Sequence, residues 1–170
     1  MEGGSYVPSK LFLTSGVGEH TREVASFEFA LRDAGIEEYN IVPVSSIFPP
    51  EAEVVDIEEG REELSSGQIV HAVLSRCSTE EPVPIQSAVG AARPSSGHGY
   101  LIEECAEDHE TDLGAVAESL ASELVKGDVS ERFSVSAKTE GERGKWTTAV
   151  AAAVLVVPLG WLLVDVLGLG

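Results

Sequence analysis

Apolar and polar residues follow two different periods along the chain, and these periods separate predicted strands from predicted helices. Short runs rich in β-branched and apolar residues, bounded by turn residues such as SSGQ and SSGH, are typical of strands. They lie at 10–14, 40–44, 52–57, 68–76, 84–92, 98–104 and 132–137. Pro43 favours an edge or a bulge for the second of these strands. The glycine-bearing segment 15–20 predicts a loop.

Two segments carry the helical period instead. In the first, from Arg22 to Ala34, apolar residues recur at helical spacing and Gly35 is placed as a C-terminal cap. The second helix begins after Thr111 or Asp112, and its apolar stripe consists of Leu113, Val116, Ala117, Leu120, Leu124 and Val125. Strands and helices do not alternate strictly, and no repeat or linker divides residues 1–157. The pattern predicts one α+β domain, an αββα-type sandwich with helices outside two mostly antiparallel sheets.

The charge of the chain limits its partners. It has 29 acidic and 11 basic residues, a net charge of −18, and no basic cluster. Such a surface repels phosphate backbones and anionic lipid, which argues against nucleic-acid binding. The acidic residues are spread along the chain, as in a solvated surface, and a high-salt cytoplasm is a hypothesis that explains them.

Two cysteines and the N-terminal segment bear on the compartment. Cys77 and Cys105 lie 28 residues apart without a C-x-x-C motif, so we expect two free thiols in a reducing cytosol. Cys105 and His109 lie amid several carboxylates, but without fixed ligand spacing we expect a solvated loop and no metal site. The first ten residues lack the pattern of a signal peptide. The expected location is the cytoplasm.

The C-terminal segment is apolar. Residues 147–164 contain no charge over 18 positions, which is the minimum length for crossing a bilayer, although Pro158 and Gly160 interrupt them. We expect a buried strand or helix at 148–157, followed by a tail at 158–170 that packs on the domain or on a neighbouring subunit. A membrane anchor is the less favoured alternative.

A glycine motif at 16–19, GVGE, resembles a phosphate-binding loop only weakly. It lacks a third glycine and a lysine or second hydroxyl residue placed for phosphate. We expect a tight turn or a close approach of two backbones there.

The pair Ser45-Ser46 differs from the other two Ser-Ser pairs. Those at 65 and 95 run directly into glycine, whereas the first follows a β-branched run and precedes Ile47, Phe48 and two prolines. Packing on both sides and the prolines would restrict its backbone. Held in this way, the Ser46 hydroxyl could attack the carbonyl carbon of Ser45 and turn the amide into an ester.

β-Elimination of that ester would leave a dehydroalanine, which hydrolyses to a ketone. The product is a pyruvoyl group at a new N-terminus. Asn40, five residues before Ser45, is a candidate to stabilise the oxyanion of this self-cleavage. The alternative is a serine pair that only satisfies hydrogen bonds at a strand end.

Four segments in order resemble one known family. LTSGVGE, SFEFALRDAGI, YNIVPVSSIFPPEAEVV and GYLIEE are similar to the pyruvoyl-dependent arginine decarboxylases, over most of residues 10 to about 157. The resemblance implies self-cleavage between Ser45 and Ser46 into a β chain, 1–45, and an α chain, 46–170. It also implies a homotrimer with active sites between subunits.

The resemblance further implies the reaction and its residues. L-arginine would form a Schiff base with the pyruvoyl group from Ser46 and lose CO2 to give agmatine for polyamine biosynthesis. Glu103 takes the place of the proton donor, and Glu28 that of the carboxylate that binds the guanidinium. Val24, Leu31 and Ile47 complete the expected substrate-binding set.

One departure keeps the substrate open. Some family members have aspartate where this chain has Glu28, so the depth of the pocket is not fixed by the resemblance. A pyruvoyl decarboxylase of another amino acid is one alternative, although Glu28 favours a cationic side chain over aspartate. An unprocessed, non-catalytic relative that acts as an assembly subunit is the other.

Overall fold

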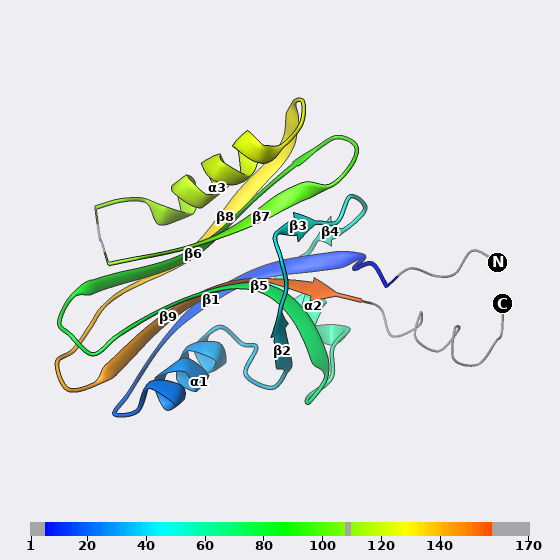
Figure 1. Cartoon of the computed structure of the whole chain (residues 1–170). Coiled ribbons are helices and arrows are strands. Elements are labelled where there is room, and N and C mark those ends of the chain that lie inside the picture. The colour runs from blue at the N-terminus through cyan, green and yellow to red at the C-terminus, as the bar shows by residue number, and fades with distance from the viewer. Residues whose placement is uncertain (1–5, 108–109, 158–170) are drawn as a thin grey trace.

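A computed structural model describes residues 6–107 and 110–157 of the 170-residue chain. These residues form two stacked sheets with a helix on each outer face (Figure 1). In chain order the elements are β1 (Lys10–His20), α1 (Glu23–Asp33), β2 (Asn40–Pro43), β3 (Ile47–Phe48), β4 (Glu53–Val54), α2 (Ile57–Glu62), β5 (Ile69–Thr79), β6 (Pro84–Pro94), β7 (Gly99–Ala106), α3 (Leu113–Leu124), β8 (Val129–Glu140) and β9 (Trp146–Val156). The α+β sandwich predicted from the sequence is therefore confirmed.

The two sheets have different strand orders. The first, sheet A, runs β2-β5-β9-β1-β4, and the second, sheet B, runs β3-β7-β6-β8. All pairs in sheet B are antiparallel, whereas the short edge strands β2 and β4 pair in parallel with β5 and β1. Pro43 ends an edge strand, as its missing N–H requires.

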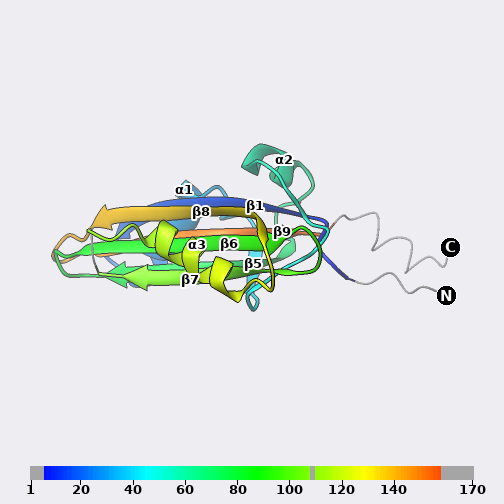
Figure 2. The same cartoon turned by 90° about the horizontal axis from the view of Figure 1, so that it is seen from above.

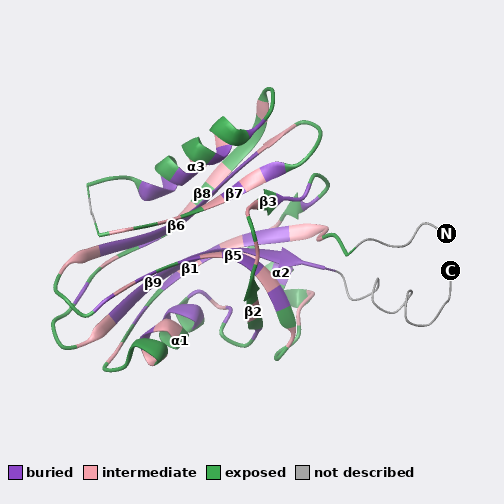
Figure 3. Cartoon of the chain, viewed as in Figure 1, coloured by how far each residue is buried: buried purple, intermediate pink, exposed green. Residues whose placement is uncertain are grey.

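Apolar clusters are buried between the two sheets and between each sheet and its helix. Between the sheets lie Leu11, Phe48, Ala52, Val73, Val89, Ala91, Leu101, Ala151, Ala153 and Leu155. A second cluster joins sheet A to α1, and two smaller ones join sheet B to α3. Figure 2 shows α3 along sheet B from above, and Figure 3 shows the buried residues concentrated on the facing strands.

Helix boundaries agree with the sequence prediction. In α1 the chain leaves the helix through Gly35 at φ +70°, a conformation that favours glycine. At α3, Asp112 is the N-cap, because its side chain accepts a hydrogen bond from the backbone N–H of Ala115. The prediction missed α2, whose N-cap is Asp56.

The predicted loop at 15–20 is wrong, because these residues continue β1 and pair with β9 as far as His20. The glycines of this segment nevertheless serve the predicted close approach of two backbones. A Cβ on Gly16 would lie 2.4 Å from the Ala30 carbonyl oxygen, and one on Gly18 would lie 2.3 Å from the Ala30 nitrogen. Glycine therefore lets α1 lie directly on sheet A.

The apolar segment at 148–157 is a strand. β9 lies between β5 and β1 in sheet A, and its side chains are buried from Thr147 onward. Residues 158–170, the predicted tail, lie outside the described residues. In the described part of the chain, no helix has the length and apolar character needed to cross a membrane.

The expectation of two free thiols is wrong. A disulfide joins Cys77 on β5 to Cys105 on β7, with a Cα–Cα distance of 5.4 Å. Sequence spacing could not reveal this pair, because the two cysteines belong to different sheets that meet only in the folded molecule. His109, the imagined metal partner of Cys105, lies outside the described residues.

Candidate active site

The Ser45-Ser46 pair lies where the chain crosses from one sheet to the other. β2 is the edge strand of sheet A and β3 is the edge strand of sheet B, and only three residues, Val44 to Ser46, separate them. We call this segment the crossover. Figure 1 shows it spanning the open side of the sandwich between β2 and β3.

Backbone hydrogen bonds hold the crossover on both sides of the Ser45–Ser46 peptide bond. The N–H of Val44 donates to the carbonyl of Ala72 on β5, at 3.0 Å. The N–H of Leu101 on β7 donates to the carbonyl of Ser46, at 2.9 Å. One side of the bond is therefore fixed to sheet A and the other side to sheet B.

The carbonyl of Ser45 has a donor of its own. The N–H of Ile47 donates to it at 2.9 Å, which closes a tight turn around Ser46. A donor at this oxygen would stabilise negative charge if the carbonyl carbon were attacked. The arrangement therefore polarises the carbonyl that a Ser46 hydroxyl would attack.

The segment after the crossover is packed into sheet B. Phe48 is fully buried between the sheets, and the guanidinium of Arg93 stacks over its ring, 4.6 Å from the centroid. Arg93 also donates to the carbonyl of Ala52 and pairs with Glu131 at 2.7 Å. These contacts fix the chain two residues beyond Ser46.

Glu103 lies on β7, two residues after the anchor at Leu101. Successive residues of a strand point to opposite faces, so Leu101, Glu103 and Cys105 share a face. Leu101 is buried between the sheets and Cys105 is bonded to β5, so this face is directed toward sheet A. Glu103 itself is exposed in the single chain, since β3 pairs with β7 only at Gly99 and Tyr100.

Glu28 belongs to a separate cavity beside β2, with a volume of about 360 Å³. The cavity is lined by Phe27, Glu28, Leu31, Glu37, Tyr39, Asn40, Ile41, Val42, Pro43 and Leu74. Its walls are apolar with two carboxylates, a combination suited to a side chain with an alkyl stem and a cationic end. None of Ser45, Ser46, Ile47 and Glu103 is among the lining residues.

The remaining predicted residues lie as follows. Asn40 lines the cavity, but its side-chain amide donates to the carbonyl of Gly67 at 2.7 Å, away from the crossover. Val24 precedes Glu28 by one helical turn, is 67% exposed and lies outside the lining. Leu31 lines the cavity and is 6% exposed, and Ile47 follows the crossover at the start of β3 with 45% exposure.

Sequence reasoning missed several lining residues. Leu74 comes from β5, and only the β2–β5 pairing brings it beside α1. Arg76 lies two residues after Leu74 on β5 and contacts α1. Its guanidinium lies 4.4 Å from the centroid of the Phe27 ring and pairs with Glu23 at 2.6 Å. The alternation of side chains between the two faces of β2 could have revealed Ile41 as a lining residue.

Arg61 contacts Tyr39, one of the residues that line the cavity beside β2. Arg61 on α2 makes a hydrogen bond with Tyr39 and an ion pair with Glu38, and both interactions raise the pKa of Arg61 above its ordinary value. Arginine is charged at any physiological pH, so Arg61 remains a cation beside Tyr39, which lines the cavity.

Comparison with known proteins places these features in a family. Residues 10–158 match the family described as pyruvoyl-dependent arginine decarboxylase. Pyruvoyl-dependent arginine decarboxylase 2 of Archaeoglobus fulgidus is 46% identical over 159 residues, covering 89% of this chain and 98% of the relative.

Two further relatives have the same coverage of this chain. The proteins named pyruvoyl-dependent arginine decarboxylase 1 from Methanosarcina mazei and Methanosarcina acetivorans are 45% and 43% identical over 160 residues, with 97% of each relative covered. The match includes the crossover, Glu28 and Glu103 within its bounds. The chain belongs to the pyruvoyl-dependent arginine decarboxylase family.

Proposed function

We propose that this chain cleaves itself between Ser45 and Ser46 and then decarboxylates L-arginine to agmatine and CO2. The observation that carries the proposal is the crossover, whose central peptide bond is held to a different sheet on each side. Its Ser45 carbonyl already accepts a hydrogen bond from the N–H of Ile47. The names of the relatives support the class of cofactor and substrate.

The cleavage uses only groups of the chain and one water molecule. The Ser46 Oγ attacks the Ser45 carbonyl carbon, the C–N bond breaks, and the proton of the hydroxyl passes to the freed amine. Loss of the Ser46 α-proton then expels the Ser45 carboxylate and leaves a dehydroalanine. Water replaces its nitrogen, which departs as ammonia, and the chain ends in a ketone. The N–H of Ile47 stabilises the oxyanion of the first step.

The residues around Ser46 fit a pyruvoyl group. The Ser46 carbonyl, which becomes the inner carbonyl of that group, accepts a hydrogen bond from the N–H of Leu101. The group supplies a ketone for the substrate amine and an electron sink for the bond to CO2. Leu101 thus fixes its orientation, and the packed Phe48 fixes the strand behind it.

Glu103 is proposed as the proton donor. It lies on the same face of β7 as Leu101, two residues beyond the N–H that donates to the Ser46 carbonyl. A carboxyl in its protonated form would deliver a proton to the α-carbon after CO2 leaves. Glu104, directed to the opposite face of the strand, has no such access.

The cavity beside β2 is proposed to bind the arginine side chain. Glu28 would receive the guanidinium, and Leu31 together with the apolar walls would contact the alkyl chain. Glutamate in place of aspartate moves the carboxylate outward by about one methylene, about 1.5 Å. This cavity and the crossover are two separate half-sites in one chain.

The two half-sites are proposed to meet across a subunit interface in a homotrimer. In support, Glu103, Val24 and Ile47 are all exposed in the isolated chain, and the edge of β7 beside Glu103 has no strand partner in the described residues. Asn40 would then act on the crossover of a neighbouring subunit, because the crossover of its own chain lies beyond the far end of β2. Agmatine would supply polyamine biosynthesis.

Release of CO2 from labelled amino acids tests this function. Purified protein should release CO2 from arginine and form agmatine, with little release from lysine, ornithine, histidine or aspartate. Treatment with arginine and borohydride together should block the activity and label the longer chain. Release from aspartate but not arginine would refute the assigned substrate, and an intact, inactive chain would favour the unprocessed relative.

A further inference from the structure

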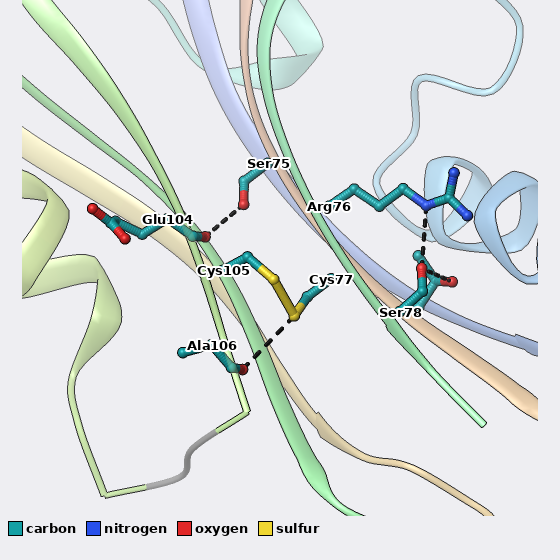
Figure 4. The surroundings of a disulfide bond; sticks show 8 residues. Ser75, Arg76, Cys77, Ser78, Glu104, Cys105 and Ala106 are labelled. Carbon is teal, nitrogen blue, oxygen red and sulfur yellow. Dashed lines mark hydrogen bonds between the residues drawn. A yellow bond between two sulfur atoms is a disulfide. The ribbon is translucent and has the colours of Figure 1, made fainter. Parts of the chain in front are cut away.

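We propose that the Cys77–Cys105 disulfide positions Glu103 for proton donation, so that reducing it slows turnover. The proposal rests on the proposed function, in which Glu103 is the proton donor. It adds a pair of positioning residues, on two different strands, to the proposed catalytic residue. Figure 4 shows the bond between β5 and β7.

The disulfide joins the same two strands that hold the crossover. Ala72 on β5 anchors its first residue and Leu101 on β7 anchors its last, while Cys77 and Cys105 link these strands further along. Between the crossover anchors and the disulfide, the hydroxyl of Ser75 on β5 donates to the carbonyl of Glu104 on β7 at 2.5 Å (Figure 4). The distance between β5 and β7 is therefore set by one covalent bond and several weaker contacts.

Glu103 lies between two fixed points of β7. Leu101 is held by the crossover and the core, and Cys105 is held by the disulfide. On one side β7 pairs with β6 from Tyr100 to Ala106, but on the other side β3 pairs with it at Gly99 and Tyr100. In the part of the chain that the structure describes, no strand lies beside Glu103 on this edge, and the disulfide at Cys105, two residues away, is the nearest covalent link from β7 to sheet A.

Self-cleavage increases the importance of this restraint. Breaking the Ser45–Ser46 bond removes the covalent connection between β2 on sheet A and β3 on sheet B. Both cysteines lie in the segment 46–170, so their bond survives the cleavage and still joins the two sheets. The carbonyl oxygen of Ala106 lies 3.8 Å from the Cys77 sulfur, which shows how closely β7 follows β5 at this point.

The bond can be opened by a defined reaction. A dithiol such as dithiothreitol donates two electrons and two protons, so that the disulfide becomes two thiols and the reagent becomes a cyclic disulfide. Cys105 is an exposed residue whereas Cys77 is 5% exposed, so the reagent would approach the bond from the Cys105 side. A small-molecule disulfide, such as oxidised glutathione, reverses the reaction.

The test compares matured wild-type enzyme before and after reduction with the variant Cys77→Ala/Cys105→Ala. Alkylation and denaturing mass analysis count the free thiols in each sample. We expect reduction and the double variant to lower kcat for arginine about tenfold while KM changes less than about twofold, because a misplaced catalytic group affects turnover more than binding. Oxidised glutathione should restore the wild-type enzyme only.

A readout independent of activity accompanies the kinetics. Amide hydrogen exchange of residues 102–106 should rise on reduction, while exchange in β9 should stay the same. Val156→Ala serves as a control for lost stability, since it truncates a fully buried residue on the far side of sheet A. It should lower Tm and leave kcat unchanged.

The outcomes separate this proposal from the proposed function. Oxidised enzyme that is cleaved and active, but keeps its kcat with two free thiols, overturns the positioning role alone. Two free thiols in protein purified without reductant also overturn it. Oxidised protein that is neither cleaved nor active refutes the proposed function, and the positioning role with it. If the double variant does not fold, reduction of the matured wild type decides the question.

Discussion

Three Ser-Ser pairs lie in very different surroundings in this chain. At 65 and 95 the pair runs into a glycine with positive φ, +80° at Gly67 and +92° at Gly97, and a Cβ on either glycine would meet open space. Those segments are exposed turns. At 45 the pair joins two sheets, and the neighbouring backbone is bonded to β5 on one side and β7 on the other.

The three pairs have the same two residues, so what distinguishes them is how the surrounding backbone is held. In the turn at 65, the carbonyl of Ser65 accepts from the N–H of Gln68, and the chain continues directly into β5 of sheet A. At the crossover, the chain enters a core at Phe48 within two residues of Ser46. We therefore attribute the proposed reactivity of the first pair to a peptide bond held by a different sheet on each side, whereas the pair at 65 precedes a strand of sheet A and the pair at 95 joins two strands of sheet B.

Replacing the second serine of each pair tests this comparison with the largest effect. We expect Ser46→Ala to abolish both self-cleavage and decarboxylation, because no hydroxyl remains to attack Ser45. Ser66→Ala should be cleaved completely and remain active. Denaturing electrophoresis distinguishes the two results, and cleavage of the Ser46→Ala chain at the same bond would contradict the mechanism.

Glu103→Gln separates the formation of the site from its use. The variant should cleave itself, yet its kcat should fall by about 10²- to 10⁴-fold, the usual contribution of a positioned general acid. Glu104→Gln is the matched control, because its side chain faces away from sheet A. Equal losses in both variants would show that β7 tolerates no change there and would remove Glu103 from its role.

Glu28→Gln asks whether the crossover is only half of the site. Loss of a charge-assisted pair with the guanidinium is expected to cost about 1.5–3 kcal/mol, which raises KM for arginine about 10- to 150-fold. Self-cleavage should be unaffected, since Glu28 lies in the cavity beside β2. Glu23→Gln, on the same helix but paired with Arg76, should leave KM within about twofold. Slow cleavage in Glu28→Gln would show that the two half-sites are not independent.

A glycine placed after the reactive pair makes the crossover resemble the turns. Ile47→Gly should slow self-cleavage about fivefold, because glycine adds about 1 kcal/mol of backbone entropy to be lost. Gly67→Ala, at a φ that favours glycine, should lower the stability by about 1–2 kcal/mol without slowing cleavage. Time courses after refolding measure both rates. Unchanged cleavage in Ile47→Gly would refute the role of restraint.

Local chemistry explains which parts of the fold the sequence could predict. The two long helices carry clear apolar stripes and end at Gly35 and near Gly127, both with positive φ. Residues 15–20 were misjudged because their glycines suggest a loop, whereas they serve close packing beneath α1. The helix α2 spans six residues, too few for a helical period to show.

The candidate site was predictable only where one segment carried the information. The serine pair could be identified from its neighbours in sequence, and Glu28 and Glu103 from the family resemblance. The side-chain amide of Asn40 donates to the carbonyl of Gly67 because β2 pairs with β5, and this pairing is not visible in the sequence around Asn40. The disulfide likewise depends on the packing of two sheets, which no local pattern describes.

Intact-mass analysis of the denatured wild-type protein tests the central claim most directly. Self-cleavage at the crossover predicts two chains of 45 and 125 residues. The longer chain should be lighter, by one molecule of ammonia, than the fragment that simple hydrolysis would give, and it should react with hydrazines. A catalytically active preparation that consists of a single 170-residue chain would contradict the claim.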